Sequence, residues 1–242
     1  MQAVILARGL GTRLSPLTRT IPKPMVPVAG VPYLEHQLRL LKRQGITDIL
    51  LLTGYLGNRI EEYFGQGGSL GLSIRYSREA SPLGTGGALR QARPLLADDF
   101  IVIYGDSYLP IPYAPVLAHL RAARAQGVLV VYDGRLGESP VPNNVGLGPE
   151  GYVTCYAKDS GQVTGLEYVE AGVLAFRQSA LDLLPAEGVV SLEQCLFPQL
   201  IVRRELVSFV TSQRFYDIGT PERLEAIESL LANDHHANSI SN

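Results

Sequence analysis

The chain has 242 residues, of which 46% are hydrophobic and 18% charged, and its formal net charge is −2 at pH 7. A chain of this length and apolar content buries a substantial core, which excludes intrinsic disorder. The nearly balanced charge supplies no global basic field for nucleic acid or a membrane surface, so any anion site must be built from local charges.

The N-terminal segment MQAVILARGL lacks the basic flank and the small-residue cleavage pattern of a signal peptide. No apolar run approaches the roughly 18 residues that span a bilayer. Cys155 and Cys195 lie far apart without a CxxC motif, which fits two buried thiols in a reducing compartment and argues against a zinc site. We therefore expect a soluble, cytoplasmic protein that has neither a nucleic-acid nor a membrane partner.

The first part of the chain, up to about residue 134, alternates apolar runs with helical periodicity. Several of the apolar runs lack polar alternation, which is typical of parallel strands covered on both faces. Strands are predicted at 2–7, 47–54, 72–77, 100–105 and 128–133. The segments between them predict helices, because apolar residues recur at helical spacing over 34–41, 60–64 and 88–96, and Glu35 can pair with Arg39. This pattern predicts an α/β fold with a Rossmann-like, doubly wound, mostly parallel sheet, in which ligands bind beyond the carboxyl ends of the strands.

Beyond residue 134 the alternation becomes less regular. Strands are predicted at 143–148, 152–158, 170–176 and 205–210, with short helices between them. We expect a smaller mixed α/β lobe over 135–232 that extends the same sheet, so that 1–232 forms a single domain. A last helix with an apolar face over 224–231 precedes the polar segment 233–242, which we expect to be a flexible tail.

The loop after the first strand combines glycines, cations and prolines. It reads LARGLGTRLSPLTRTIPKPM over 6–25. Gly9 and Gly11 can direct backbone amides outward from the strand, as phosphate binding requires. Arg13 and Lys23 add positive charge, and the prolines on both sides of the lysine restrict its backbone. Preorganised cations of this kind suit a polyphosphate.

Two common phosphate-binding motifs do not fit this loop. A Walker loop requires GxxxxGK[ST], but here the lysine comes far after Gly11 and follows a proline. A dinucleotide fingerprint requires GxGxxG, but Leu14 replaces the third glycine. The second departure also disfavours an NAD-dependent oxidoreductase.

The same loop resembles the signature of the sugar-1-phosphate nucleotidyltransferases, the NDP-sugar pyrophosphorylases. Their common form is LAGGxGTRL, followed by PKPM or PKPL and a PVxGxP segment. The similarity continues in order through SPLGTGGAL (81–89), YGDS (104–107), EAGVLAF (170–176) and FYDIGTPERL (215–224). Shorter members, such as heptose-1-phosphate guanylyltransferases and N-acetylmuramate-1-phosphate uridylyltransferases, are the most similar.

This resemblance implies an enzyme in which a sugar 1-phosphate attacks the α-phosphorus of a nucleoside triphosphate and releases pyrophosphate. A phosphate monoester with a second pKa near 6 is mostly dianionic at neutral pH, so the reaction needs no general base. The resemblance implies nucleotide binding by the part up to about residue 134 and sugar binding by 135–232. The alternative is a non-catalytic subunit of the same fold that senses nucleotide or sugar phosphate.

Site residues follow from the same resemblance. Arg13 is expected to hold the β- and γ-phosphates and Lys23 to stabilise charge around the α-phosphorus. Asp106 and Asp217, each after a short apolar run, are expected to bind Mg²⁺ as hard oxygen ligands. Further nucleotide contacts are implied at Leu6, Ala7, Gly9, Gly11, Thr12, Gly84, Thr85 and Gly86.

Contacts to the sugar phosphate are implied at Asn144, Gly146, Lys158, Glu170 and Gly172, although the family's EKP around the lysine has become AKD here. The sequence leaves open the sugar, the nucleobase and the oligomeric state, a homodimer included.

Arg8 stands where the family usually has glycine. We expect it to supply its backbone amide while its side chain extends outward or along the triphosphate entrance, as an accessory cation.

Overall fold

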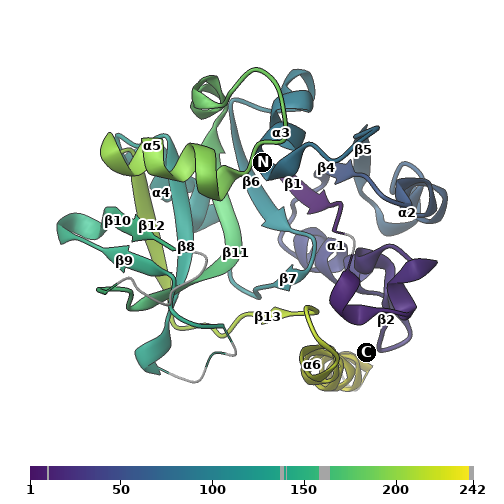
Figure 1. The fold of residues 1–242 in the computed structure, drawn as a ribbon. Helices are drawn as coiled ribbons and strands as arrows, with labels where there is room; N and C mark the ends of the chain where they lie inside the picture. Colours follow the sequence, from purple (N-terminus) through teal and green to yellow (C-terminus); the bar gives the residue numbers. More distant parts are fainter. Residues whose placement is uncertain (10, 137–138, 140, 158–163, 240–242) are drawn as a thin grey trace.

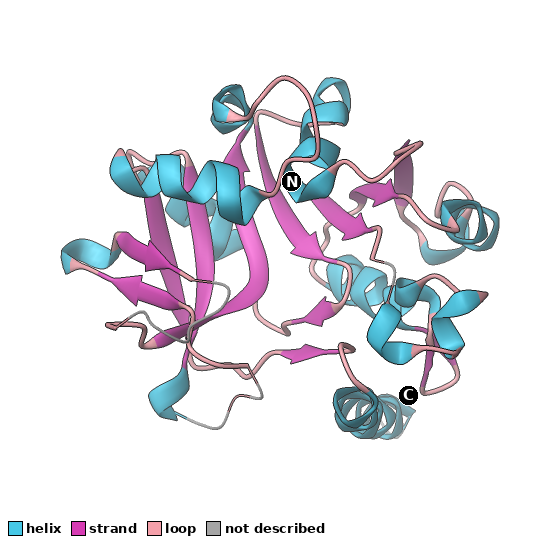
Figure 2. Cartoon of the chain, in the orientation of Figure 1, coloured by secondary structure: helices cyan, strands magenta, loops and turns pink. Residues whose placement is uncertain are grey.

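The structure is a computed structural model that describes residues 1–9, 11–136, 139, 141–157 and 164–239 (Figures 1 and 2). Within these residues, its centre is a nine-stranded sheet with the order β10-β9-β11-β6-β1-β4-β5, and β8 joins it between β11 and β12. The strands are β1 (Gln2–Ala7), β4 (Asp48–Thr53), β5 (Ser73–Arg78), β6 (Asp99–Tyr104), β8 (Gly127–Asp133), β9 (Val145–Leu147), β10 (Val153–Tyr156), β11 (Tyr168–Arg177) and β12 (Leu206–Thr211).

The strands at the centre of this sheet run parallel. β1 pairs in parallel with β4 and β6, β4 with β5, and β8 with β12, whereas β11 is antiparallel to both β6 and β8. The carboxyl ends of β1, β4, β5 and β6 therefore meet at one edge. This arrangement confirms the predicted α/β fold with its mostly parallel sheet, and every strand predicted from the sequence is present.

Side chains of β1 alternate between two buried layers. Ala3 and Ile5 belong to the core beneath α1 (Tyr33–Arg43), α2 (Gly57–Phe64), α4 (Ala114–Ala122) and α6 (Pro221–Ser239). Val4 and Leu6 belong to the core beneath α3 (Gly84–Gln91) and α5 (Phe197–Val202). The uninterrupted apolar sequence from Ala3 to Ala7 therefore packs against the layers on both faces of the sheet.

Short elements complete the chain. Two small antiparallel ladders join β2 (Pro27–Val28) to β3 (Val31–Pro32) and β7 (Ser107–Tyr108) to β13 (Tyr216–Asp217). In Figure 1, β13 lies beside β7 below the central sheet. The short helical turns are η1 (Thr12–Leu14), η2 (Leu17–Arg19), η3 (Lys23–Met25), η4 (Gly68–Leu70), η5 (Arg93–Leu95), η6 (Gly134–Leu136), η7 (Pro149–Gly151), η8 (Gln178–Leu183) and the π-helical η9 (Leu192–Leu196).

Two local predictions can be compared with the helices. Glu35 and Arg39 form the expected ion pair on α1, with 2.6 Å between Oε1 and Nη2. α6 continues through residues 233–239 and so includes most of the predicted tail, whose flexibility remains a prediction. Neither glycine nor proline interrupts the sequence after Pro221, so the helix has no signal to stop there. Within the described residues, no helix is long and apolar enough to cross a membrane.

β8 lies before residue 134 in the chain, and the two strands that pair with it, β11 and β12, lie after that residue. The later part of the chain therefore extends the same sheet, and the division into a nucleotide-binding and a sugar-binding part remains a prediction.

Candidate active site

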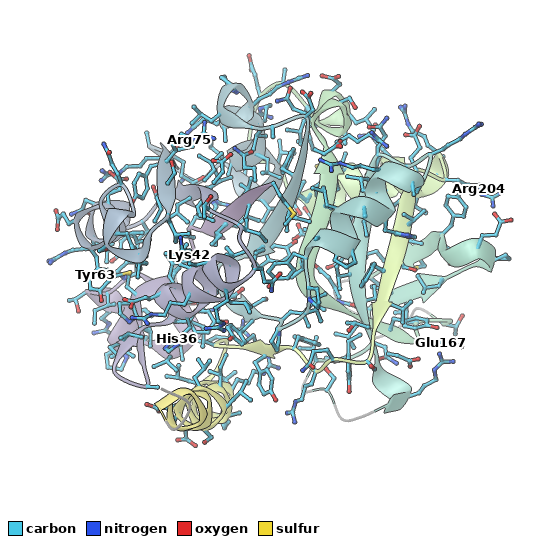
Figure 3. The ribbon with its side chains drawn as sticks, turned by 180° about the vertical axis from the view of Figure 1, so that it is seen from behind. His36, Lys42, Tyr63, Arg75, Glu167 and Arg204 are labelled. Carbon is cyan, nitrogen blue, oxygen red and sulfur yellow. The ribbon has the colours of Figure 1, made fainter. Side chains whose placement is uncertain are left out.

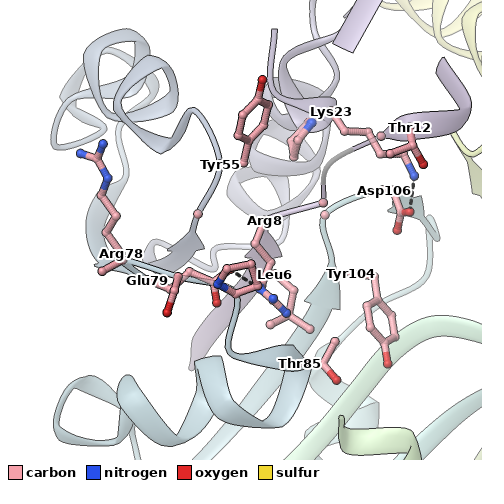
Figure 4. A pocket seen from close by; sticks show the side chains of 18 of the residues that line it. Leu6, Arg8, Thr12, Lys23, Tyr55, Arg78, Glu79, Thr85, Tyr104 and Asp106 are labelled. Atoms are coloured by element: carbon pink, nitrogen blue, oxygen red, sulfur yellow. Dashed lines mark hydrogen bonds and ion pairs between the residues drawn. The ribbon is translucent and has the colours of Figure 1, made fainter. Parts of the chain in front are cut away.

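A cavity of about 820 Å³ opens at the carboxyl edge of β1, β4, β5 and β6 (Figure 4). Its size is in the range of small-molecule sites. The lining residues come from the loop after β1, from the ends of β4 and β6, from the turn before α3 and from η9. They are Leu6, Arg8, Gly9, Gly11, Thr12, Lys23, Pro24, Gly54, Tyr55, Arg78, Glu79, Ala80, Ser81, Pro82, Thr85, Tyr104, Gly105, Asp106 and Glu193.

The glycine loop forms one wall of this cavity. Gly9, Gly11 and Thr12 line it, whereas Ala7 is fully buried in the core and does not. Gly11 has a φ of +64°, and a Cβ there would lie 3.0 Å from the Cβ of Lys23. Glycine at this position therefore lets the chain return closely enough to bring the lysine against the loop.

Lys23 lies at the start of η3 and pairs with Asp106, which follows β6. The distance from Nζ to Oδ2 is 2.5 Å (Figure 4). The Lys23 side chain is only 7% exposed, whereas that of Asp106 is 39% exposed. A buried ammonium next to an accessible carboxylate places opposite charges side by side in the cavity.

Asp217 is brought next to Asp106 by the β7–β13 ladder. It is paired with Ser107, and the amide of Ile218 donates to the Asp106 carbonyl at 3.1 Å. The Asp217 carboxylate accepts from Gly219 N at 2.6 Å and from Arg223 Nη1 at 3.0 Å. The two carboxylates predicted as metal ligands thus come from adjacent backbone positions, and each is balanced by a cation.

The Tyr33 hydroxyl is a polar atom buried near both carboxylates. It is without a hydrogen-bond partner among the described residues. Burial, followed by the charges of Asp106 and Asp217, raises its pKa, so the hydroxyl remains protonated. No cluster of three or more His, Cys, Asp or Glu side chains suited to a metal occurs in the described part of the chain. Two carboxylates and a buried hydroxyl fit Mg²⁺, which completes its shell with water and phosphate oxygens.

Arg13 is exposed and is not among the residues that line the cavity. It lies on the Asp217 side, because its Nη2 is 3.4 Å from the position that a Cβ on Gly219 would occupy. The glycine loop therefore separates its two predicted cations. Lys23 faces the cavity, and Arg13 faces the β13 turn.

In the first turn of α3, residues 84–86, one residue lines the cavity and two pack against a neighbouring segment. Thr85 lines the cavity, whereas Gly84 and Gly86 do not. Gly84 has a φ of +77°, and a Cβ there would lie 2.3 Å from the Val190 carbonyl oxygen. The amides of Gly86 and Gly87 donate to that same oxygen, at 2.8 and 3.1 Å. The glycines therefore allow close packing against the segment before η9, and the Gly86 and Gly87 amides are already used there.

Thr85 also organises a hydroxyl-rich cluster around Glu193. Its hydroxyl donates to Glu193 Oε2 at 3.0 Å, and the amide of Leu192 donates to the threonine oxygen at 2.8 Å. Tyr104 donates to Glu193 Oε1 at 2.6 Å, and Ser191 donates to its other carboxylate oxygen. Burial, followed by Glu170 and Glu193, raises the pKa of Tyr104, which keeps it a donor.

The residues predicted to bind the sugar phosphate lie next to this cluster. Asn144 Oδ1 accepts from the Glu170 amide at 2.8 Å, and the Tyr156 hydroxyl donates to Glu170 Oε2 at 2.7 Å. Gly172 has a φ of +75°, and a Cβ there would lie 2.3 Å from the hydroxyl oxygen of Ser107. This close approach holds β11 against the Asp106 turn.

Two predicted sugar residues stand apart from these contacts. Gly146 packs against the backbone, since a Cβ there would lie 2.8 Å from the Gly165 carbonyl. Lys158 lies outside the described residues.

Of the two directions expected for the Arg8 side chain, the structure excludes the outward one. The side chain lines the cavity and pairs with Glu79, with 3.0 Å from Nε to Oε1 (Figure 4). The Glu79 side chain is only 5% exposed and also accepts from the Leu83 amide at 3.0 Å. A buried carboxylate attracts the nearest cation strongly, and this attraction determines the direction of Arg8.

Glu79 and Glu193 are cavity residues that the sequence analysis did not identify. Glu79 directly follows β5, so the rule that drew attention to Asp106 after β6 also applies to it. Glu193 gave no comparable signal, because it reaches the cavity from η9 through contacts with residues distant in the sequence.

Comparisons with known proteins identify the family and similar folds. The model of the nucleotidyl transferase family matches residues 2–141. A mannose-1-phosphate guanylyltransferase from Mycobacterium tuberculosis is 33% identical over 225 residues, which cover 92% of this chain and 62% of that protein. The chain thus spans 62% of the length of this relative. A D-glycero-alpha-D-manno-heptose 1-phosphate guanylyltransferase from Aneurinibacillus thermoaerophilus is 30% identical, covering 92% of this chain and 94% of that protein.

A solved structure resembles the whole sheet and its flanking helices. HddC from Yersinia pseudotuberculosis superposes with a TM-score of 0.78 at 26% identity, covering 95% of this chain and 99% of that one. A second structure of the same protein is a complex with GMP-PN.

Proposed function

Because this chain belongs to the nucleotidyl transferase family, we propose that it transfers a guanylyl group from GTP to a sugar 1-phosphate, forming a GDP-sugar and pyrophosphate. The observation that carries this assignment is the convergence of the glycine loop, Lys23 and Asp106 on one cavity. Amides, a buried ammonium and an accessible carboxylate form the set that phosphoryl-group chemistry requires.

In this reaction an oxygen of the sugar phosphate attacks the α-phosphorus of the triphosphate. One P–O bond forms, the bond between the α-phosphorus and the bridging oxygen breaks, and the electron pair leaves with pyrophosphate. The attacking dianion needs no proton acceptor. Lys23 stabilises the charge that grows around the α-phosphorus, because its ammonium is held before any substrate binds.

Asp106 and Asp217 are the residues that would hold Mg²⁺. When bound, the ion would supply Lewis-acid stabilisation of the phosphate charge. Lys23 and Arg223 now balance these carboxylates, so metal binding has to replace at least part of each ion pair. The protonated Tyr33 hydroxyl is available beside them as a hydrogen-bond donor.

Guanine is favoured by the chemistry at the inner end of the cavity. Guanine presents two neighbouring N–H donor groups, N1–H and the 2-amino group, and a carboxylate accepts both. Glu79 is such a carboxylate, since each of its oxygens accepts one hydrogen bond in the structure and has a lone pair left. The names of both guanylyltransferase relatives agree with this base.

The sugar side carries acceptors for hydroxyl groups. Glu170 and Glu193 lie beside Tyr104, and Asn144 fixes the backbone at Glu170. A hexose or heptose presents several hydroxyls, which such carboxylates bind. We therefore propose that the acceptor is a manno-configured sugar 1-phosphate of the kind named for these relatives.

A substrate panel tests the assignment. GTP, UTP, CTP, dTTP and ATP are each incubated with mannose, heptose, glucose and glucosamine 1-phosphates and Mg²⁺, and pyrophosphate release and the product mass are recorded. We expect pyrophosphate and a GDP-sugar to form together with GTP. A Lys23→Ala variant serves as the inactive control. Absence of nucleotide sugar from every pair would contradict the transferase assignment, and a preference for another base would contradict guanine alone.

A further inference from the structure

We infer that Arg8 is a specificity-determining residue, whose guanidinium binds the O6 and N7 edge of guanine while Glu79 binds the adjacent N1 and N2 edge. This inference rests on the proposed use of GTP. On this inference Arg8, which precedes the glycine loop, selects the base and does not hold the phosphates.

The first support is the position of the guanidinium. Arg8, which follows β1, lines the cavity and reaches Glu79, which follows β5 (Figure 4). Its side chain is 14% exposed, so it is held in one place and still reaches the cavity. The bond from Nε to Glu79 is its one hydrogen bond within the described part of the chain, which leaves the two Nη groups as donors for a ligand.

The second support is that the carboxylate partner is clamped. Glu79 accepts from Arg8 through one oxygen and from the Leu83 amide through the other. A Cβ on Gly54 would lie 2.7 Å from Glu79 Oε1, so the glycine leaves room for the carboxylate. A donor and an acceptor are therefore fixed side by side at a known separation, as recognition of a base edge requires.

The third support is the complementarity of the pair to guanine. Guanine presents acceptors at O6 and N7 and donors at N1 and N2, and the bidentate contact of arginine to O6 and N7 is the commonest specific contact to this base. Adenine reverses the pattern, since it places an amino donor where arginine also donates and an acceptor where the carboxylate also accepts. Arg8 and Glu79 thus reject adenine by leaving buried groups unpaired.

Base analogues test this assignment one atom at a time. Dissociation constants of GTP, 7-deaza-GTP, ITP, ATP and UTP are measured by calorimetry without sugar phosphate, for the wild type and for Arg8→Met and Arg8→Lys. 7-Deaza-GTP lacks the N7 acceptor, and ITP lacks the 2-amino group. We expect the wild type to bind 7-deaza-GTP about tenfold more weakly than GTP. This penalty should fall to about twofold or less in Arg8→Met, whereas the ITP penalty should persist.

Arg8→Lys retains the charge next to Glu79 but cannot make a bidentate contact, so it should also lose the N7 penalty. The matched control is Arg75→Met on β5, an arginine whose side chain is 43% exposed and pairs with Asp48 (Figure 3). It should leave all the ratios unchanged. Thermal unfolding confirms that each variant is folded.

Two results would overturn the inference. One is a 7-deaza penalty that is equal in wild type and both Arg8 variants. The other is an equal loss of affinity for all five nucleotides in those variants, which would assign Arg8 to phosphates or to stacking. Because binding is measured without turnover, the two proposals can fail separately. A folded protein that binds GTP more tightly than 7-deaza-GTP but forms no GDP-sugar would contradict the transfer reaction and not the role of Arg8.

Discussion

Replacing Gly84 by alanine distinguishes a packing role for the 84–86 turn from a role in approaching the base. The added Cβ would lie 2.3 Å from the Val190 carbonyl oxygen at a φ of +77°. Backbone atoms cannot be displaced as a flexible side-chain end can, so the segment around Val190 has to move away. That movement breaks the hydrogen bonds from the Gly86 and Gly87 amides.

The expected cost follows from these contacts. A left-handed alanine costs about 1 to 2 kcal/mol, and restriction of the unfolded chain returns about 0.4 to 1 kcal/mol. Loss of two hydrogen bonds adds about 1 kcal/mol each. Gly84→Ala should therefore lower the free energy of unfolding by about 3 kcal/mol, or Tm by about 6 to 12 °C for a chain of this size.

Gly188→Ala is the matched control on the facing segment. Gly188 has a φ of +85° and no atom within 4 Å of its virtual Cβ, so only the conformational cost applies. We expect a decrease of about 1 kcal/mol, or 2 to 4 °C in Tm. Calorimetry of both variants decides between the two roles. Equal decreases in Tm, together with a raised KM for GTP only in Gly84→Ala, would refute the packing role.

Further predictions concern the phosphate and base ends of the cavity. Lys23→Ala should lower kcat by about 10²- to 10³-fold with little change in KM, because the charge it meets grows during the reaction; a change in KM alone would show ground-state binding. Asp106→Asn and Asp217→Asn should each weaken Mn²⁺ binding, measured by electron paramagnetic resonance, by about tenfold or more while the variants stay folded; unchanged Mn²⁺ affinity in both would exclude the carboxylate pair. Gly54→Ala should displace Glu79 and raise the KM for GTP by about tenfold, with a smaller increase in the KM for UTP. Equal increases for both nucleotides would contradict a role of Glu79 in binding the base.

The strands were predictable because most are short apolar runs and the others, such as β5, alternate polar and apolar residues between turn-forming residues. Both patterns depend only on neighbours in the sequence. α4 was not predicted, since its sequence APVLAHLRA mixes small residues and a proline with few large apolar ones. α6 extends beyond the apolar face predicted over 224–231, because no glycine or proline after Pro221 interrupts the helix.

The candidate site was predictable where the chain carries the motifs of the resembled family. Lys23, Asp106 and Asp217 were predicted from those motifs, and the structure brings the first two into contact. The orientation of Arg8 could not be predicted, because it depends on a carboxylate 71 residues away. The packing role of Gly84 likewise depends on Val190, which no local pattern connects to it.

The β7–β13 ladder also affects when this site is completed during synthesis. Asp217 is paired next to Asp106 only through that ladder, and it follows Asp106 by 111 residues. Because a chain emerges from the ribosome with its N-terminus first, the glycine loop and Lys23 are made long before their distant partner. A nascent chain that ends before β13 has the cavity wall but lacks the second carboxylate. The proposed metal pair can therefore assemble only after all nine strands of the central sheet have been synthesised.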